Sequence, residues 1–214
     1  MNLHTVIAII PLTEHTFILR LERKNLPFQT GQFITVRRSR TIDQREYSVY
    51  SGENEEFLEV LVREINDGKV TPQLKKLAPG DQVEVDGPFG FFRFQPQLFP
   101  SQDFLFIATG TGISPFQSFV RTFPALNYRL VHGVRYGHEA YGHEHFEKTR
   151  ITLCTTGDNN GQFKGRVTDY LSVQSISPET QCFLCGNSLM IQQSFEILTG
   201  KGVPVQNIYT EVYF

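Results

Sequence analysis

Alternating hydrophobic and polar positions dominate the first ninety residues of the chain. Turn-forming residues separate six short segments rich in β-branched and aromatic side chains: TVIAII, HTFILRLER, GQFITVRR, REYSVYS, FLEVLVRE and DQVEVDGPFG. Closely spaced strands of this kind are typical of a β-barrel or a β-sandwich. One short helix is expected in this half, with Thr71 as its cap, Pro72 at its first position and Pro79-Gly80 at its end.

The pattern changes after the proline-bearing connector QPQLFPSQD. Four near-continuous apolar segments follow, as in strands buried on both faces of a parallel sheet: DFLFIATG, YRLVHGVR, RITLCTTG and QCFLCGN. Ser114 is expected to cap a helix begun by Pro115, and a last helix over about Asn187–Thr199 precedes a final strand, QNIYTEVYF. The sequence therefore predicts two domains, a β-rich domain over 1–97 and an α/β domain over 98–214.

Composition narrows the class of protein. The 214 residues suffice for two cores of roughly 100 residues each. The 20 basic and 22 acidic residues are mixed along the chain, so no face for binding nucleic acid is expected. No apolar run approaches the roughly 18 to 20 residues of a membrane span, and the N-terminal segment does not resemble a signal peptide. A cytoplasmic protein that binds neither nucleic acid nor membrane is expected.

Three cysteines, Cys154, Cys182 and Cys185, are too few for a disulfide framework and are expected to be reduced. Cys182 and Cys185 form a Cys-x-x-Cys pair, but no second pair or histidine cluster accompanies it, so no metal site is expected. A redox couple is disfavoured because the expected strand would point the two side chains to opposite faces. Cys182 is expected to be structural, and the role of Cys185, beside Gly186, stays open.

A glycine-rich turn follows the first apolar strand of the second half. The segment IATGTGISP, residues 107–115, joins this strand to the expected helix. Such a turn brings backbone N–H groups and a helix N-terminus against a pyrophosphate, and glycine lets the ligand approach closely. Its spacing is not the Gly-x-Gly-x-x-Gly of ordinary dinucleotide folds, so the turn alone does not establish a nucleotide site.

Four motifs in one order resemble the ferredoxin–NADP reductase family: Arg45-Glu46-Tyr47-Ser48, GPFG at 87–90, GTGISP at 110–115 and CGN at 185–187. The resemblance spans almost the whole chain. It implies an antiparallel Greek-key β-barrel that binds FAD, followed by an α/β parallel-sheet domain that binds NAD(P), with a C-terminal tail that returns to the flavin. It also implies that Arg45 pairs with the FAD pyrophosphate, Tyr47 stacks on the isoalloxazine and Ser48 hydrogen-bonds near the reactive nitrogen.

The resemblance implies further cofactor contacts. Family members place a segment like Gly68-Lys69-Val70-Thr71, at the start of the short helix, against the FAD pyrophosphate. Val62 and Arg63 lie on the preceding strand, where the family contacts flavin, although Arg63 could equally be a solvated edge residue. The nicotinamide dinucleotide is expected on the glycine turn and the CGN motif, at Thr109, Gly110, Thr111, Gly112, Ser114, Pro115, Gly186 and Asn187.

The chain ends in Glu211-Val212-Tyr213-Phe214, which resembles the aromatic tail of some bacterial members of the family. The resemblance implies that the Tyr213 ring shields the flavin face used by nicotinamide, that Glu211 is a buried acid and that Phe214 contacts the flavin or its adenine arm. A terminal strand that only packs is the alternative. Four residues are expected around the line of hydride transfer, as positioning or proton-relay groups without covalent catalysis: Ser48, Cys185, Glu211 and Tyr213.

The preference between NADP and NAD depends on basic residues. Family members that prefer NADP commonly carry Ser-Arg after the third strand of this domain, whereas Thr156-Gly157 here lacks the arginine. Arg135, Lys164 and Arg166 are expected to clamp a 2′-phosphate in its place. NADP(H) is therefore favoured, and NAD(H) stays open.

The expected function is that of an FAD-dependent oxidoreductase that exchanges hydride with NADP(H) and single electrons with ferredoxin or flavodoxin. One alternative is an NAD(P)H-dependent reductase component of an oxygenase or another multi-component system. A different class is a redox-inactive nucleotide-binding sensor or scaffold. No fused ferredoxin module is expected, because a four-cysteine motif is absent. Arg37, Arg38 and Arg40 form either a basic rim for an acidic carrier or a solvated loop.

Overall fold

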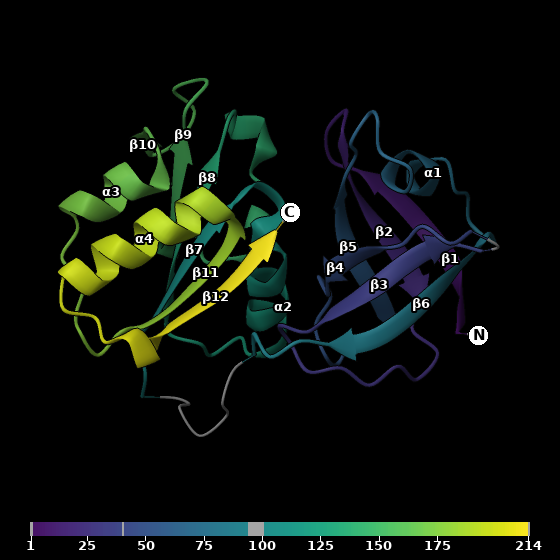
Figure 1. Ribbon diagram of the computed structural model, residues 1–214, viewed down its shortest axis with the longest axis horizontal. Helices are drawn as coiled ribbons and strands as arrows, with labels where there is room; N and C mark the ends of the chain where they lie inside the picture. The colour runs from purple at the N-terminus through teal and green to yellow at the C-terminus, as the bar shows by residue number, and fades with distance from the viewer. Residues whose placement is uncertain (1, 40, 94–100, 214) are drawn as a thin grey trace. The chain divides into compact units, whose positions relative to one another are not determined.

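The computed structural model describes residues 2–39, 41–93 and 101–213, and its contacts divide the chain into two compact units (Figure 1). The first, called the barrel unit below, takes the residues up to Arg93 together with Ser114–Thr122. The second, called the sheet unit, takes the remainder of the chain. The predicted domain boundary at 97/98 lies outside the described residues.

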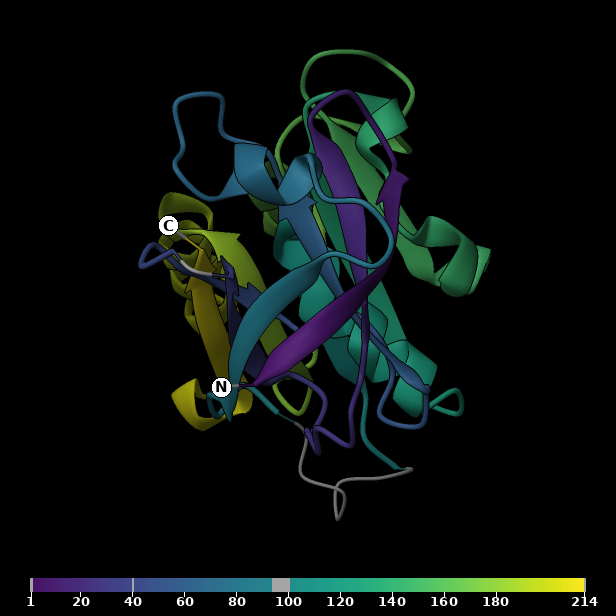
Figure 2. The same ribbon diagram turned by 90° about the vertical axis from the view of Figure 1, so that its right-hand side faces the viewer.

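The barrel unit is built on one six-stranded antiparallel sheet, in the order β4-β3-β6-β1-β2-β5. Val49, directly after β4, bridges to Val60 of β5, so the two edge strands meet and the sheet closes into the barrel seen in Figure 2. All six predicted strands are present: β1 (Leu3–Pro11), β2 (Thr16–Glu22), β3 (Phe33–Arg38), β4 (Arg45–Ser48), β5 (Phe57–Arg63) and β6 (Gln82–Phe89).

The short helix of the barrel unit, α1 (Thr71–Lys75), begins differently from the prediction. Val70 holds the cap position, no side chain caps the helix, and Pro72 is its second residue. The Thr71 hydroxyl instead accepts a hydrogen bond from the Ile65 N–H at 2.9 Å. The prediction that Thr71 caps the helix is therefore wrong, because its side chain stabilises the preceding loop.

Helix α2 (Ser114–Thr122) packs with the barrel, although it lies far beyond it in the sequence. Its Ser118 hydroxyl donates to the Ser51 carbonyl and accepts from the Thr30 hydroxyl, both at 2.7 Å. The prediction that Ser114 caps this helix is also wrong. A 3₁₀ turn, Gly110–Ile113, runs directly into α2, so Ser114 is already its first helical residue.

The sheet unit contains six parallel strands in the order β10-β9-β8-β7-β11-β12. Their bounds are β7 (Phe104–Thr109), β8 (Tyr128–Val134), β9 (Ile151–Thr155), β10 (Phe163–Lys164), β11 (Gln181–Asn187) and β12 (Ile208–Tyr213). Helices α3 (Val167–Val173) and α4 (Ser188–Gly200) cover one face of the sheet (Figure 1). On the other face, Phe106 stacks on Tyr128, which meets Phe146 edge to face.

The predicted strands of the second half are all confirmed, whereas β10 and α3 were not predicted. Strand β10 has only two residues, and α3 buries only Val167, Thr168 and Leu171, so neither leaves a periodic pattern long enough to detect. The predicted start of α4 is confirmed, because the Asn187 side chain accepts from the N–H groups of Leu189 and Met190. Among the described residues, no helix is long and apolar enough to cross a bilayer.

Candidate functional site

The Arg-x-Tyr-Ser motif forms β4, paired with β3 at Val36–Arg45 and Ile34–Tyr47. Strand alternation places Arg45 and Tyr47 on one face, with Arg45 exposed and the Tyr47 ring packed against the barrel core. Burial raises the pKa of Tyr47, and the nearby Arg45 charge lowers it. Among the described residues, the buried Tyr47 hydroxyl has no hydrogen-bond partner. An unsatisfied buried hydroxyl of this kind costs free energy.

Ser48 points to the opposite face of β4 and is buried, at 3 % exposed. Tyr47 and Ser48, which were both expected to contact the flavin, therefore lie on opposite faces of β4. The face that Arg45 and Tyr47 offer fits a phosphate-bearing, planar cofactor such as FAD, with a cation and an aromatic ring side by side.

The segment from Gly68 to Thr71 is a tight loop that leads into α1. The Gly68 N–H donates to the Ile65 carbonyl at 2.8 Å, while Val70 and Thr71 are buried and Lys69 is exposed. On the preceding strand, the Val62 side chain lies wholly in the core, so only its backbone can meet a ligand. Arg63 is exposed at the end of β5. The contact of this group with FAD stays a prediction.

The glycine turn of the sheet unit is packed against the end of β11. A Cβ atom on Gly112 would lie 2.4 Å from the Cys185 carbonyl oxygen, and one on Gly186 would lie 2.3 Å from the Thr109 hydroxyl. These two glycines are therefore required by close packing within the protein. At Gly110, by contrast, a Cβ would meet nothing within 4 Å, and the φ of +54° is one that other residues rarely adopt. Gly110 is thus the position where the turn leaves room for a ligand.

The remaining residues of the expected nucleotide site surround this turn. Thr109 ends β7 and its hydroxyl accepts the Asn187 N–H at 3.1 Å, which ties the CGN motif to the turn. Thr111 follows Gly110 in the turn, and Ser114 and Pro115 are buried at the start of α2. The carboxyl ends of parallel strands are where open α/β sheets bind nucleotides, and these residues lie at that edge.

Three of the four residues expected around the line of hydride transfer lie together at the ends of β11 and β12. Cys185 is paired in register with Glu211, and Tyr213 is hydrogen-bonded to the Cys185 side chain. Burial and the Glu211 charge raise the pKa of Cys185 well above its ordinary value, against the opposing effect of Tyr213. The thiol is therefore neutral and unsuited to act as a nucleophile. The fourth residue, Ser48, belongs to the barrel unit, and Phe214 lies outside the described residues.

The basic residues expected to hold a 2′-phosphate lie partly together. Thr155 pairs with both Val134 and Lys164, so Arg135, Thr156 and Lys164 are neighbours at the carboxyl edge of the sheet. Lys164 donates to the Asn159 side chain at 2.6 Å. Arg166 instead lines a groove between α3 and α4, together with Thr168, Asp169, Ser172, Gln193, Glu196 and Ile197.

Two carboxylates that the sequence did not single out lie among these cations. One Glu139 oxygen accepts the N–H groups of Arg135 and Tyr136, at 3.0 and 2.9 Å. Asp158 accepts the Gly137 N–H at 2.9 Å, and hydrogen bonds from the Gly137 and Asn160 backbones lower its pKa. Neither acid has a recognisable motif, because each is defined by the backbone groups that it caps. Both add negative charge where a 2′-phosphate was expected.

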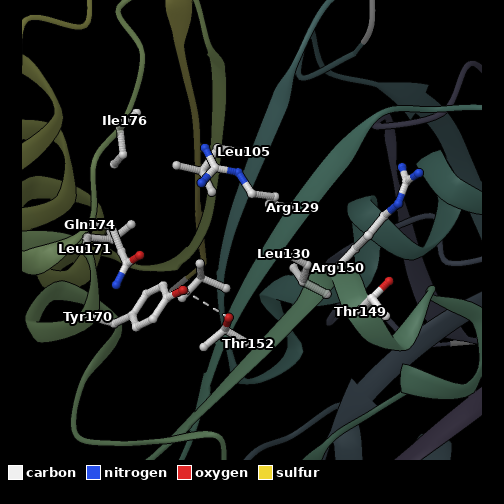
Figure 3. A pocket seen from close by; sticks show the side chains of 11 residues that line it. Leu105, Arg129, Leu130, Thr149, Arg150, Thr152, Tyr170, Leu171, Gln174 and Ile176 are labelled. Carbon is white, nitrogen blue, oxygen red and sulfur yellow. Dashed lines mark hydrogen bonds between the residues drawn. The ribbon is translucent and has the colours of Figure 1, made fainter.

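A cavity of about 140 Å³ lies at the other end of the same sheet, at the starts of β7, β8 and β9 (Figure 3). Within it the Thr152 hydroxyl donates to the Tyr170 hydroxyl at 3.2 Å. This amino-terminal edge is opposite the one that binds nucleotides in open α/β sheets, so the cavity is separate from the glycine turn. No cluster of side chains suited to a metal ion exists in the described parts of the chain.

Two family models match the chain in succession. An oxidoreductase FAD-binding domain matches residues 8–94, and an oxidoreductase NAD-binding domain matches residues 106–195. Together they span most of the chain. Each matched range covers one of the two sets of expected cofactor contacts, the first including β4 and the second the glycine turn.

Similar proteins extend over nearly the whole length. The chain is 25 % identical over 239 residues to a ferredoxin–NADP reductase of Azotobacter vinelandii, covering 96 % of this chain and 92 % of the relative. It is 26 % identical to the toluate 1,2-dioxygenase electron transfer component of Pseudomonas putida, covering 94 % of this chain and 64 % of the relative. The fold is similar to that of a ferredoxin NADP⁺ reductase from Neisseria gonorrhoeae with bound FAD and NADP. The TM-score is 0.87 and the sequence identity is 23 %, and the match covers 100 % of this chain and 98 % of the other.

Proposed function

This chain belongs to the ferredoxin–NADP reductase family of oxidoreductases, and from that premise we propose that it exchanges hydride with NADP(H) through FAD and passes single electrons to ferredoxin or flavodoxin. The observation that carries the proposal is the group formed by Cys185, Glu211 and Tyr213 beside the glycine turn. A sensor or scaffold without redox chemistry would not need this group at the nucleotide edge of the sheet.

Each part of the chain has a separate task in this function. Bound FAD supplies the conversion between two-electron and one-electron steps. Arg45 offers a cation to its pyrophosphate, and the partly buried Tyr47 ring offers a flat aromatic face. On the other unit, Gly110 leaves room for the dinucleotide, and the neutral Cys185 thiol bounds the site without being consumed. The Tyr213 ring occupies a position for which the nicotinamide ring competes.

The oxidoreductase proposal is tested by colour. Purified protein should be yellow or become yellow with added FAD, and anaerobic NADPH should bleach the flavin absorbance. Tyr47→Leu should lower FAD retention, whereas Tyr136→Leu, on the sheet unit, should leave it unchanged. A colourless protein that also fails to take up FAD would instead support the sensor or scaffold function.

NADP(H) is the proposed dinucleotide, with Arg135 and Lys164 next to Thr156 as the contacts for its 2′-phosphate. Glu139 and Asp158 oppose this preference, since an ionised carboxylate repels a phosphate. Rates with NADPH and NADH should therefore be compared in the wild type and in Arg135→Ala, Lys164→Ala and Arg166→Ala. If none of the three variants reduces the NADPH preference, the phosphate site is wrongly placed.

The electron carrier is proposed from charge. Arg38 is exposed at the end of β3, whereas Arg37 is paired with Glu84 through its Nε atom at 2.8 Å. Arg40 lies outside the described residues. The exposed Arg38 favours an acidic carrier such as ferredoxin or flavodoxin. An oxygenase partner is the alternative, because the chain is similar to an oxygenase electron transfer component. Rates of electron transfer to purified ferredoxin and flavodoxin from the same organism should be measured at low and high salt. Fast, salt-sensitive transfer would support these carriers, and no transfer to either would favour the oxygenase partner.

A further inference from the structure

A histidine pair lies beneath the glycine turn on the face of the sheet opposite α3 and α4. His132, on β8, is fully buried, at 0 % exposed, and its Nε2 atom lies 2.9 Å from the Gly110 carbonyl oxygen. Its Nδ1 atom lies 2.9 Å from Nε2 of His143, which belongs to the segment between β8 and β9. The pair therefore links Gly110, the open position of the turn, to a segment that has no other assigned role.

Chemistry fixes the direction of these hydrogen bonds. A carbonyl oxygen only accepts, so His132 must carry its proton on Nε2 and donate it to Gly110. The bare Nδ1 of the neutral ring must then accept, so His143 donates from its Nε2. Burial and the neighbouring His143 lower the pKa of His132 to about 3, and burial lowers the pKa of His143 to about 4. At neutral pH both rings are therefore uncharged. The two hydrogen bonds then run in one direction, from His143 to His132 and from His132 to the Gly110 carbonyl.

The hydrogen bond from His132 adds to the 3₁₀ turn in holding the orientation of the turn's first peptide. The Gly110–Thr111 peptide is trans, so its carbonyl and its N–H point in opposite directions. With the carbonyl held toward His132, the N–H is directed away from the histidines. Gly110 has no Cβ and a positive φ, so no side chain of its own restrains this peptide, which is held by the 3₁₀ turn and by the bond from His132.

We propose that His132 and His143 are positioning residues of the dinucleotide site, which hold the Gly110–Thr111 peptide in the orientation that receives the pyrophosphate. The identity of the ligand rests on the proposed function, whereas the hydrogen bonds between the two histidines and Gly110 do not depend on it. Neither histidine needs to touch the dinucleotide. Their effect is to lower the cost of organising the turn before the ligand binds.

The geometry can be tested without any nucleotide. In protein labelled with ¹⁵N-histidine, two rings should be in the Nε2–H form and should stay neutral down to about pH 4 to 5, where exposed histidines are already charged. His143→Leu should change the Nδ1 shift of His132. If both rings titrate near pH 6.5, or if the His132 signal does not change, the hydrogen-bonded chain does not exist.

The role in binding is tested by comparing three variants with the wild type. His143→Leu removes the donor and should raise the dissociation constant and KM for the dinucleotide about three- to tenfold, with less than a twofold change in kcat. His143→Gln, whose amide can donate in the same place, should restore most of the affinity. His145→Leu is the matched control, because His145 is exposed on the same short turn and its ring lies 3.7 Å from the Glu144 carboxylate.

The outcomes separate this inference from the proposed function. If the wild type binds no flavin and no dinucleotide, the proposed function fails while the ¹⁵N result still decides the geometry. If the wild type is active and His143→Leu binds the dinucleotide normally, the positioning role is refuted. A loss in His143→Leu that His143→Gln does not restore would also refute it, because it would show that the side chain serves only to fill space.

Discussion

The three cysteines show how a residue's surroundings decide its chemistry. Each is fully buried, and burial raises the pKa values of Cys154 and Cys182 to about 12. Only the thiolate reacts quickly with disulfide reagents, so a buried thiol of high pKa is inert. We expect a disulfide reagent to label none of the three thiols in the native protein and all three after unfolding in denaturant. Rapid labelling of one thiol in the folded protein would contradict this prediction.

Tyr213 provides a second test at the residue scale. Replacing Tyr213 with Ser removes the ring that competes with nicotinamide, so the oxidised dinucleotide should bind about tenfold more tightly and leave more slowly. Tyr213→Phe keeps the ring and loses only the hydroxyl next to Cys185, so its affinity should match the wild type. Titration of the flavin spectrum with NADP⁺ measures both. Equal affinity in the wild type and the Ser variant would show that the ring does not compete.

Single residues were predictable from the sequence only where their neighbours lie close in the chain. The burial of Cys182 follows from a local strand pattern, and the start of α4 near Asn187 follows from a local helix pattern. The partner of His132 is a histidine on an irregular segment eleven residues later, without periodicity to indicate the contact. The orientation of Thr71 was missed because two hydrogen bonds were available to it locally, and the sequence does not rank them.

At the scale of elements, α2 is attached to the barrel by a buried ionic network. Glu59, on β5, is 2 % exposed and lies between Arg20, at 2.7 Å, and Arg121 of α2, at 2.8 Å. Arg121 also pairs with Glu55. Since burial of a charge is tolerated only when it is compensated, this network fixes the helix that follows the glycine turn to the FAD-binding unit.

Removing Arg121 should therefore destabilise the protein. We expect Arg121→Ala to lower the free energy of unfolding by about 2 to 3 kcal/mol, less than for an isolated buried pair because Arg20 still compensates Glu59. Arg150→Ala is the control, since its pair with Glu147 is partly solvated and should contribute about 1 kcal/mol or less. Urea unfolding measures both variants. Equal decreases in the free energy of unfolding of the two variants would mean that the ion pairs of Arg121 stabilise the fold no more than a partly solvated pair does.

Elements were predictable in proportion to the length of their pattern. Strands such as β5 and β7, with near-continuous burial, were placed from the sequence, and so was the 13-residue helix α4. The two-residue β10 is defined by its pairing with β9, which no local pattern reveals. The attachment of α2 to the barrel was missed for a similar reason. Its polar residues Ser118 and Arg121 have partners some 60 to 90 positions away.

For the whole molecule, the order of strand-rich and alternating segments indicated a barrel followed by a parallel sheet, and both are confirmed. The strand pattern alone allowed a barrel or a sandwich, and the resemblance implied the barrel. Closure depends on contacts between separate segments of the chain, such as the bridge between Val49 and Val60 and the hydrogen bond from the Tyr50 N–H to the Glu59 carbonyl. The balance of charge at the dinucleotide edge was also missed. Asp158 binds the Gly137 N–H, which the fold brings to it, and Glu139 binds backbone groups of its own turn, which no sequence motif marks.

The buried histidines couple the stability of the whole protein to pH. Their pKa values in the folded protein, about 3 and about 4, lie below the ordinary value of 6.5 that holds after unfolding. Between pH 6.5 and about 4 the unfolded chain therefore binds protons that the folded protein does not, so stability falls as the pH falls. Each histidine can contribute up to about 1.4 kcal/mol for every pH unit in this range. Above pH 6.5 their contribution is complete and constant.

Comparison of variants isolates this contribution from that of the carboxylates, which titrate in all of them. We expect the free energy of unfolding of His143→Gln, measured in urea at pH 7, 6, 5 and 4.5, to decline less steeply than that of the wild type. His145→Gln, which removes an exposed histidine from the same turn, should follow the wild type. Parallel curves for all three proteins would mean that His143 titrates normally in the folded state, and the neutral, directional histidine chain under Gly110 would have to be abandoned.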